Sequence, residues 1–374
     1  MPVILIPLVF ILLAFDCQNL ISRFRHAVSL EDESSEDYTI LVPLFGNPDV
    51  LSNLEFLQKH KERVLLVLNT TNERMSSFAE QMENDGWKVH RTNFLEAKPR
   101  VSRLVQAGLE DITTTYVMRI DADTTSLEDP GRAIRALELR NADYASSKVL
   151  VNNPRSLAEH LQATEYSMAM LARHFRPWMT SGACIIAKTS ALKIILSKHT
   201  HWWNGEDVEQ GIIAKHYKMK VAHLDFHVYT DAPPTFKALY KQRKLWWAGN
   251  VRQSIMNLDQ MIWFPAYLCY NVFLVYVAFL LRSRLLATTP LEFVSALPLM
   301  ILLYILITTI ANFQVRSKWF LVFPIYSLIQ VTVMPAIGVV VFIKTAVKNR
   351  STGRYLIGWK REKWIAPEIA LPAE

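Results

Sequence analysis

The chain has 374 residues, enough for one large globular domain or two ordinary ones. Hydrophobic residues make up 51% of it and its formal net charge is +7, a composition that argues against an ordinary soluble enzyme. Its three cysteines are far apart and odd in number, a pattern that fits neither a disulfide framework nor a zinc site. No module that combines basic and aromatic residues is visible, so we expect no nucleic acid among the partners.

The first apolar segment lies at the N-terminus, over residues 3–15. It lacks the positive start and the small-residue cleavage site of a secretory signal, and Arg23 and Arg25 follow it. We therefore predict a transmembrane signal anchor over residues 1–22, with the next segment in the cytoplasm under the positive-inside rule. Residues 23–37, which include an acidic stretch rich in serine, are predicted to be a linker.

From residue 38 onwards, apolar runs typical of strands alternate with patterns typical of helices. Strands are predicted over residues 39–43, 64–68, 87–90 and 116–120, and helices over residues 53–61, 75–85 and 101–110. This alternation predicts an α/β domain with a mostly parallel sheet, which we place at residues 38–234. Ligands of such sheets bind beyond the carboxyl ends of the strands. Asp121 and Asp123 fall at such an end.

Two later segments form amphipathic helices. The first covers residues 156–175 and carries on one face Leu157, Leu161, Met168, Leu171 and Phe175. That face either packs in the protein core or lies at a membrane surface. The second covers residues 235–258 and mixes aromatic with basic side chains, which is typical of a helix at the bilayer interface.

Three segments lack Lys, Arg, Asp and Glu altogether, over residues 261–281, 293–315 and 319–343. Each is long enough to cross about 30 Å of hydrocarbon. Core helices of a large soluble protein are the alternative, but three such segments almost in series favour an α-helical transmembrane bundle at residues 259–347. A re-entrant hairpin in the last segment, which contains Pro324 and Pro335, would return the basic tail, residues 348–374, to the cytoplasm.

Asp121 and Asp123 are candidate metal ligands. Mg²⁺ or Mn²⁺ takes hard oxygen ligands, and a bound divalent cation can neutralise the charge of a diphosphate leaving group. Two aspartates at positions i and i+2 after a strand can offer both carboxylates to one ion. The alternative is a helix cap or turn, which short acidic pairs after strands often form.

Glu206 and Asp207 are candidates for the general base. Transfer of a group with inversion needs a base opposite the leaving group, and Asp207 is the first choice with Glu206 second. Both precede residues 208–217, which are predicted to be helical, so the helix dipole is expected to lower the pKa of these carboxylates and keep the base ionised. The alternative is an N-cap with acidic residues in the first turn.

A further segment, residues 242–246, has the sequence Gln-Arg-Lys-Leu-Trp. Arg243 can pair with a phosphate through its two-pronged guanidinium, and Trp246 offers an apolar face on which a sugar ring can stack. A basic amphipathic helix at a membrane surface would have the same composition.

In order and spacing, four motifs resemble those of the processive family-2 glycosyltransferases, the group of cellulose, chitin and hyaluronan synthases. They are Asp121-Ala122-Asp123, Thr180-Ser181-Gly182-Ala183-Cys184, Gly205-Glu206-Asp207 and Gln242-Arg243-Lys244-Leu245-Trp246. The similarity runs from about residue 39 to residue 247 and on into the apolar segments. It implies a GT-A (Rossmann-like) fold, an inverting mechanism and a Mn²⁺ or Mg²⁺ ion.

The resemblance also implies roles for individual residues. Those implied to bind the donor are Val42, Pro43, Asn69, Lys98, Asp121, Gln242 and Arg243. Those implied to bind the acceptor are Ser181, Gly182, Cys184 and Trp246, and the metal ligands would be Asp121 and Asp123. The chain departs from the family pattern at Asn69, where an aspartate is usual, at Ala97, where a glycine precedes the lysine, and at Leu245, where an arginine is usual.

These observations predict an integral protein of the cell or inner membrane whose catalytic domain faces the cytosol, where nucleotide sugars are found. Its main predicted activity is transfer of UDP-linked glucose or N-acetylglucosamine to a growing polysaccharide or oligosaccharide, which its own spans could secrete. One alternative is the addition of a single sugar to a polyprenyl phosphate or another lipid. An alternative of a different class is a sugar-binding membrane module without catalytic activity.

Overall fold

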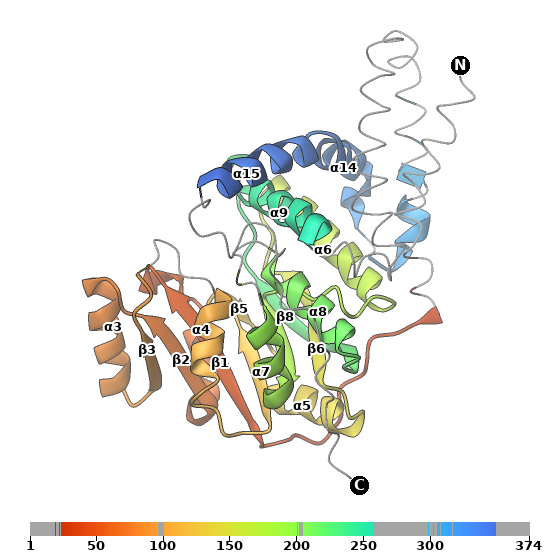
Figure 1. The fold of residues 1–374 in the computed structure, drawn as a ribbon. Helices are drawn as coiled ribbons and strands as arrows, with labels where there is room; N and C mark the ends of the chain where they lie inside the picture. The colour runs from red at the N-terminus through yellow and green to blue at the C-terminus, as the bar shows by residue number, and fades with distance from the viewer. Residues whose placement is uncertain are drawn as a thin grey trace.

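The computed structural model describes residues 24–95, 101–199, 205–256, 308–315 and 317–348, together with the single positions 19, 22, 201, 298, 302, 305 and 306. Its centre is an eight-stranded sheet with the order β3-β2-β1-β4-β7-β6-β8-β5 (Figure 1). The strands are β1 (Tyr38–Phe45), β2 (Val64–Asn69), β3 (Lys88–Thr92), β4 (Tyr116–Ile120), β5 (Thr124–Thr125), β6 (Tyr144–Val151), β7 (Cys184–Lys188) and β8 (Val221–Thr230).

The sheet is mixed. Strands β1 to β4 lie parallel, and β6 and β8 share their direction, whereas β7 and β5 run antiparallel to their neighbours. The four predicted strands are all present, and the prediction of an α/β domain is confirmed in this form. β1 continues to Phe45 instead of ending at Pro43. Proline fits there because the ladder between β1 and β4 ends at Leu41, before the residue that has no amide hydrogen to donate.

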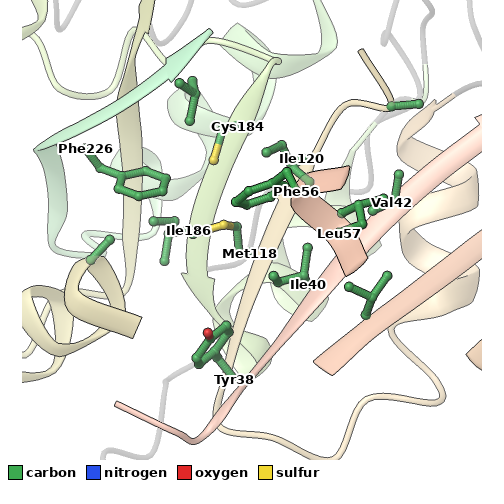
Figure 2. Close-up of a cluster of buried hydrophobic side chains, with 14 of the residues drawn as sticks. Tyr38, Ile40, Val42, Phe56, Leu57, Met118, Ile120, Cys184, Ile186 and Phe226 are labelled. Carbon is green, nitrogen blue, oxygen red and sulfur yellow. The ribbon is translucent and has the colours of Figure 1, made fainter. Parts of the chain in front are cut away.

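Helices cover both faces of the sheet. One face packs against α2 (Leu54–Lys59), α3 (Glu73–Asn84) and α5 (Pro130–Leu139), and the other against α4 (Val101–Gly108), α7 (Thr189–Lys198) and α8 (Glu206–His216). In β1, Ile40 and Val42 point into the first core, shown in Figure 2, and Leu41 points into the second. Burial on both faces explains why β2 is a continuous apolar run rather than an alternating one.

Four helices gather beyond the carboxyl ends of the strands: α6 (Leu157–Arg173), α9 (Phe236–Met256), α14 (Phe323–Thr332) and α15 (Met334–Lys348). Two short 3-10 helices accompany them, η5 (Phe313–Val315) and η6 (Lys318–Leu321). α6 begins with a capping box formed by Ser156 and Glu159. It buries Leu161 and Met168 against Leu239 of α9 and against aromatic residues of α14. Of the predicted apolar face, Leu161 and Met168 are therefore buried within the protein, whereas Leu157 is exposed.

The helix α9 is exposed at its start and covered at its end. Phe236 and Tyr240 are exposed, whereas Arg252 and Gln253 are fully buried. α15 lies alongside α9 (Figure 1), so closely that a Cβ atom on Gly338 would lie 2.8 Å from the backbone of Trp247. The second half of α9 is thus an internal helix between the catalytic domain and α15, not a helix on a surface.

Within the described ranges, no helix combines the length and the apolar character needed to cross a bilayer. The predicted third span, residues 319–343, is divided into η6, α14 and α15, and prolines mark the divisions. Pro324 is the second residue of α14 and Pro335 the second residue of α15, positions where the missing amide hydrogen costs nothing. Apart from positions 19 and 22, the predicted anchor lies outside the described residues. The apolar segment at residues 261–281 lies outside them as well, as does about half of the segment at residues 293–315.

The predicted linker packs against the domain. Val28 pairs with Leu224 of β8, and Arg132 of α5 pairs with Asp32. Ser34 lies so close to α5 that a Cβ atom on Gly131 would clash with its hydroxyl at 1.9 Å. The acidic stretch therefore packs along the basic surface of α5 and does not form a free linker.

Candidate active site

The strand β4 delivers Asp121 to the edge of the sheet, in a turn that backbone contacts fix. The amide of Asp121 donates to the carbonyl of Ala183 at 2.9 Å. Asn53 Nδ2 donates to the carbonyls of Asp121 at 3.0 Å and of Thr124 at 2.6 Å. The position of the Asp121 carboxylate at the end of β4 is therefore set by two neighbouring segments.

A buried arginine faces this aspartate. Arg119 belongs to β4, and its Nη2 donates to Oδ1 of Asp121 at 2.6 Å. The same nitrogen lies 3.9 Å from Oε1 of Glu206, at the start of α8. Arg119 thus joins the end of the central strand to the acidic start of a helix that is far away in the sequence.

The candidate base Asp207 is held by the neighbouring loop. The amide of Gly182 donates to Oδ2 of Asp207 at 2.9 Å, and the Thr180 hydroxyl donates to its backbone carbonyl. α8 begins after Gly205, whose φ of 70° lies in the left-handed region that glycine tolerates. Gly182 therefore lies beside Asp207, and Ser181 next to it is half-buried.

Burial dominates the acid-base properties of this cluster. Desolvation raises the pKa of Asp121 to about 7, and Asp123 and Asp207 add to the shift while Arg119 opposes it. Desolvation likewise raises the pKa of Glu206 to about 7, against the effect of Arg119. The expected lowering by the helix dipole is therefore wrong for Glu206, because the loss of water outweighs the partial charge at the helix terminus.

The two aspartates of the candidate metal site fit a divalent cation together with its substrate. Among the described residues, no three His, Cys, Asp or Glu side chains gather closely enough to hold a metal by themselves. Mg²⁺ and similar ions, however, often bind through one or two carboxylates plus substrate phosphates. Burial raises the pKa of both Asp121 and Asp123, and a bound cation would favour their ionised forms. These residues therefore suit an ion that arrives with a diphosphate.

The aromatic side chain predicted to bind the acceptor is accessible. Trp246 is 42% exposed and stacks on Tyr166 of α6, with ring centroids 6.3 Å apart. Arg243 lies over the Trp246 ring at 4.3 Å. Burial raises the pKa of Tyr166 to about 12, and Asp123 adds to the shift.

Cys184 does not line the acceptor site as predicted. It is the first residue of β7, is fully buried, and packs among Met118, Ile120 and Ile186 in the first core (Figure 2). Strand alternation explains this, since a residue whose side chain points into the core cannot also face a ligand. Burial also raises the pKa of this thiol to about 12.

The predicted donor residues do not all reach the cluster. Val42 and Pro43 are buried within β1, and Asn69 is 1% exposed at the end of β2. Asn69 Oδ1 accepts from the amide of Phe94 at 2.8 Å, and its Nδ2 donates to the Phe94 carbonyl at 3.2 Å. Its amide therefore orders the segment after β3. Lys98 lies outside the described residues.

Arg243 and Gln242 are engaged differently from the prediction. Arg243 is buried, and its Nη2 donates to Oε2 of Glu165 at 2.8 Å. The Tyr326 hydroxyl donates to the same oxygen at 2.6 Å. The guanidinium predicted to bind a phosphate thus links α6, α9 and α14. Oε1 of Gln242 is buried without a hydrogen-bond partner among the described residues.

Sequence reasoning missed Arg119, Tyr166 and Glu165. Arg119 carried a signal, because a charged residue inside an otherwise buried apolar strand needs a partner. Tyr166 and Glu165 carried none, since their partners are about 80 residues or more away along the chain.

Comparisons with known proteins agree with this geometry. Residues 116–343 match a family model described as glycosyl transferase family group 2. No curated protein matches the sequence. Among solved structures, mannosyltransferase PcManGT from Pyrobaculum calidifontis, in complex with GDP-Man and Mn²⁺, is similar with a TM-score of 0.53 and 10% identity, over 84% of this chain and 93% of that chain.

A second similar structure is S. aureus TarS 1–349 in complex with UDP-GlcNAc, with 13% identity over 85% of this chain and 92% of that chain. Its TM-score of 0.41 is too low to carry an argument. The likeness to PcManGT shows a shared GT-A-like fold and no more. The family match spans more than half of the chain, from β4 to α15, and includes Asp121, Asp207 and Trp246. The chain therefore belongs to glycosyl transferase family group 2 and is a glycosyltransferase.

Proposed function

We propose that this glycosyltransferase transfers a sugar, with inversion, from a nucleoside diphosphate sugar to a growing polysaccharide or oligosaccharide at a membrane. UDP-glucose and UDP-N-acetylglucosamine are the proposed donors. One observation carries the proposal: Asp121 and the acidic start of α8 meet at the carboxyl end of β4, joined by Arg119.

In the proposed reaction, Asp207 takes the proton of an acceptor hydroxyl. The acceptor oxygen attacks the anomeric carbon from the side opposite the diphosphate, the bond from that carbon to the diphosphate oxygen breaks, and UDP leaves. The Gly182 amide holds one oxygen of Asp207, so the carboxylate is oriented and its other oxygen can accept the proton. A divalent cation bound by Asp121 and Asp123 would neutralise the charge of the leaving diphosphate.

Exposed apolar side chains support attachment to a membrane. They lie on η6, α14 and α15 and at the junctions between these helices: Leu321, Val322, Ile325, Ile329, Val333, Val340, Ile343 and Val347. A patch of this extent on a soluble monomer is unusual and marks a surface made for a partner or a bilayer. Together with the apolar segments at residues 261–281 and 293–315, it supports an integral membrane protein with its catalytic domain in the cytosol.

The same site suits addition of a single sugar to a polyprenyl phosphate or another lipid. Leu245 favours this second candidate, because the synthases that the chain resembles carry an arginine there to bind the donor phosphate. The proposed processive synthesis depends on that contact more than a single transfer does.

The test uses the purified full chain with Mn²⁺ and a panel of UDP-sugars and GDP-mannose, with nucleotide release as the readout. We expect release with at least one UDP-sugar and its loss, by about a hundredfold or more, in Asp121→Asn and Asp207→Asn. Asp111→Asn, at a half-exposed aspartate that pairs with His90, is the matched control and should keep full activity. Full activity in both site variants would refute the proposal.

The size of the product separates the two candidates. With a labelled donor, a ladder of products indicates a polymer, whereas one product extractable into organic solvent indicates transfer to a lipid. Metal-dependent donor binding without turnover across the panel would instead indicate a sugar-binding module.

A further inference from the structure

Arg119 is a charged residue in a position built for an apolar one. β4 is buried along its whole length, and Val117, two residues earlier on the same face, belongs to the second core. The Arg119 side chain is 7% exposed. Removing a guanidinium from water is costly unless carboxylates compensate for the lost hydration, so a buried arginine needs such partners.

The compensation comes from carboxylates that the proposed reaction uses. Oδ1 of Asp121 accepts from Arg119 at 2.6 Å, and Oε1 of Glu206 lies at 3.9 Å. Asp207 also contributes to the favourable field that raises the pKa of Arg119. A Cβ atom on Gly182 would lie 3.5 Å from Nη1 of Arg119 and 3.4 Å from Cβ of Asp207, so the guanidinium reaches the loop that holds the base.

We infer that Arg119 is a positioning residue that competes with the divalent cation for Asp121 and ties Asp121 to the acidic start of α8. The inference rests on the proposed function for the identity of that cation. Asp121 offers one carboxylate, and in this structure the guanidinium holds one of its oxygens. An arriving cation has to share or displace that contact, which weakens binding of the metal alone.

Competition with the cation for Asp121 depends on the positive charge of Arg119. The connection of Asp121 to the start of α8 depends on the geometry of the guanidinium. A neutral side chain at position 119 removes the competitor, so metal binding tightens at a pH at which the Asp121 carboxyl is ionised. Arg119 also lowers the pKa of Asp121, so the measurement is made above that pKa. Lysine keeps the charge, but its side chain is shorter and ends in a point charge without the rigid guanidinium that holds Nη2 between Asp121 and Glu206. It therefore keeps the competition for Asp121 and loses the connection to α8. The two kinds of variant therefore separate the two parts of the role.

The experiment measures Mn²⁺ affinity without donor, from the electron paramagnetic resonance signal of free Mn²⁺ over the full chain. Arg119→Met is expected to tighten Mn²⁺ binding about tenfold while lowering kcat for nucleotide release, because Asp121 and α8 lose their connection. Arg119→Lys is expected to bind Mn²⁺ within about twofold of the unmodified chain and still to lower kcat. Damage to the site alone would weaken Mn²⁺ binding, so tighter binding in a less active variant is not a sign of misfolding.

The control for a general charge effect is Lys188→Met. Lys188 pairs with Tyr116 at the other end of β4 and forms an ion pair with Asp143. The variant removes one positive charge from the same sheet, and its Mn²⁺ affinity should stay within about twofold of that of the unmodified chain. Should Arg119→Met not fold, Arg119→Gln is neutral as well and carries the same expectation.

The inference is overturned if the neutral variants bind Mn²⁺ no more tightly than the unmodified chain, or if Arg119→Lys binds it about tenfold more tightly. Failure of the proposed function looks different. In that case no sugar donor yields free nucleotide, whatever the order of the Mn²⁺ affinities.

Discussion

At the scale of single residues, burial decides how the acidic groups of the site behave. Glu206 begins α8, where the helix dipole favours a negative charge, yet desolvation raises its pKa from 4.5 to about 7. Ser102 donates its amide to Oε2 of Glu206 at 3.1 Å, which limits the shift without reversing it. The folded protein is therefore less stable when Glu206 is ionised than when it is protonated.

Glu206→Gln tests this cost. A carboxyl whose pKa is higher in the folded protein binds its proton more tightly there, so its ionisation lowers stability as the pH rises from about 4.5 through about 7. The shift corresponds to roughly 3 kcal/mol at full ionisation, and glutamine avoids this loss. We therefore expect the unfolding temperature of Glu206→Gln, relative to the unmodified chain, to be higher at pH 8 than at pH 5.

Differential scanning fluorimetry at the two pH values measures the difference. Glu110→Gln, at an exposed position, is the control and should shift neither midpoint. An equal effect of Glu206→Gln at both pH values would contradict the assignment.

At the scale of elements, α9 fixes the helix that carries the acidic pair. Arg252 of α9 donates to Oε2 of Glu209 at 3.0 Å, and both side chains are fully buried. Gln253 Nε2 donates to the carbonyl of Gly205 at 2.7 Å, just before α8 begins. Arg243 on the same helix binds Glu165 of α6, and Tyr326 of α14 donates to the same carboxylate. The helix α9 therefore connects the acidic pair to α6 and α14.

Loss of the buried ion pair should be costly. Arg252→Met leaves the charge of Glu209 buried with one cation fewer, and the expected loss of unfolding free energy is about 3 kcal/mol or more. The double variant Arg252→Met with Glu209→Gln removes both charges and should recover part of that loss. Denaturant unfolding of the two variants and of Glu209→Gln completes the cycle, and additive effects would rule out coupling between the two residues.

The contact between α8 and the loop between α6 and β7 depends on a glycine. A Cβ atom on Gly211 would lie 1.9 Å from the carbonyl oxygen of Trp178, a backbone atom that cannot move aside easily. We expect Gly211→Ala to lower the unfolding free energy by about 3 kcal/mol and to reduce nucleotide release, because α8 and Asp207 shift together.

Gly46→Ala provides the matched comparison for Gly211→Ala. Its Cβ would meet nothing within 4 Å, and its φ of +79° predicts a cost of about 1 kcal/mol. If both variants lose the same unfolding free energy, α8 moves away from Trp178 at little cost and the expectation for Gly211→Ala is wrong.

At the scale of the whole molecule, the exposed apolar face of η6, α14 and α15 predicts how the chain partitions. If it is embedded in a bilayer, we expect the full chain to stay with the membrane fraction through high-salt and carbonate washes and to need detergent for release. Attachment through basic residues to anionic lipid would be screened by salt. Release by salt alone would therefore contradict membrane embedding. Immunoblots of the wash fractions provide the measurement.

The sequence by itself determined the strands from β1 to β4, because strands that are buried on both faces consist of continuous apolar runs. It also placed Asp121 at the carboxyl end of β4 and the acidic pair at the start of α8, since both follow local periodicity and turn residues. The antiparallel direction of β7 could not be predicted from the sequence, because strand pairing depends on partners far away in the chain.

Only the tertiary structure decided which groups face one another. Arg119 meets Glu206 across 87 positions of sequence and Arg243 meets Glu165 across 78, and no local pattern records such pairs. The same holds for Cys184, whose neighbours in a small-residue motif suggested an open site while strand alternation turned its side chain into the core. Periodicity encodes which face of an element is apolar, whereas the contacts of a buried charge follow from how the elements pack.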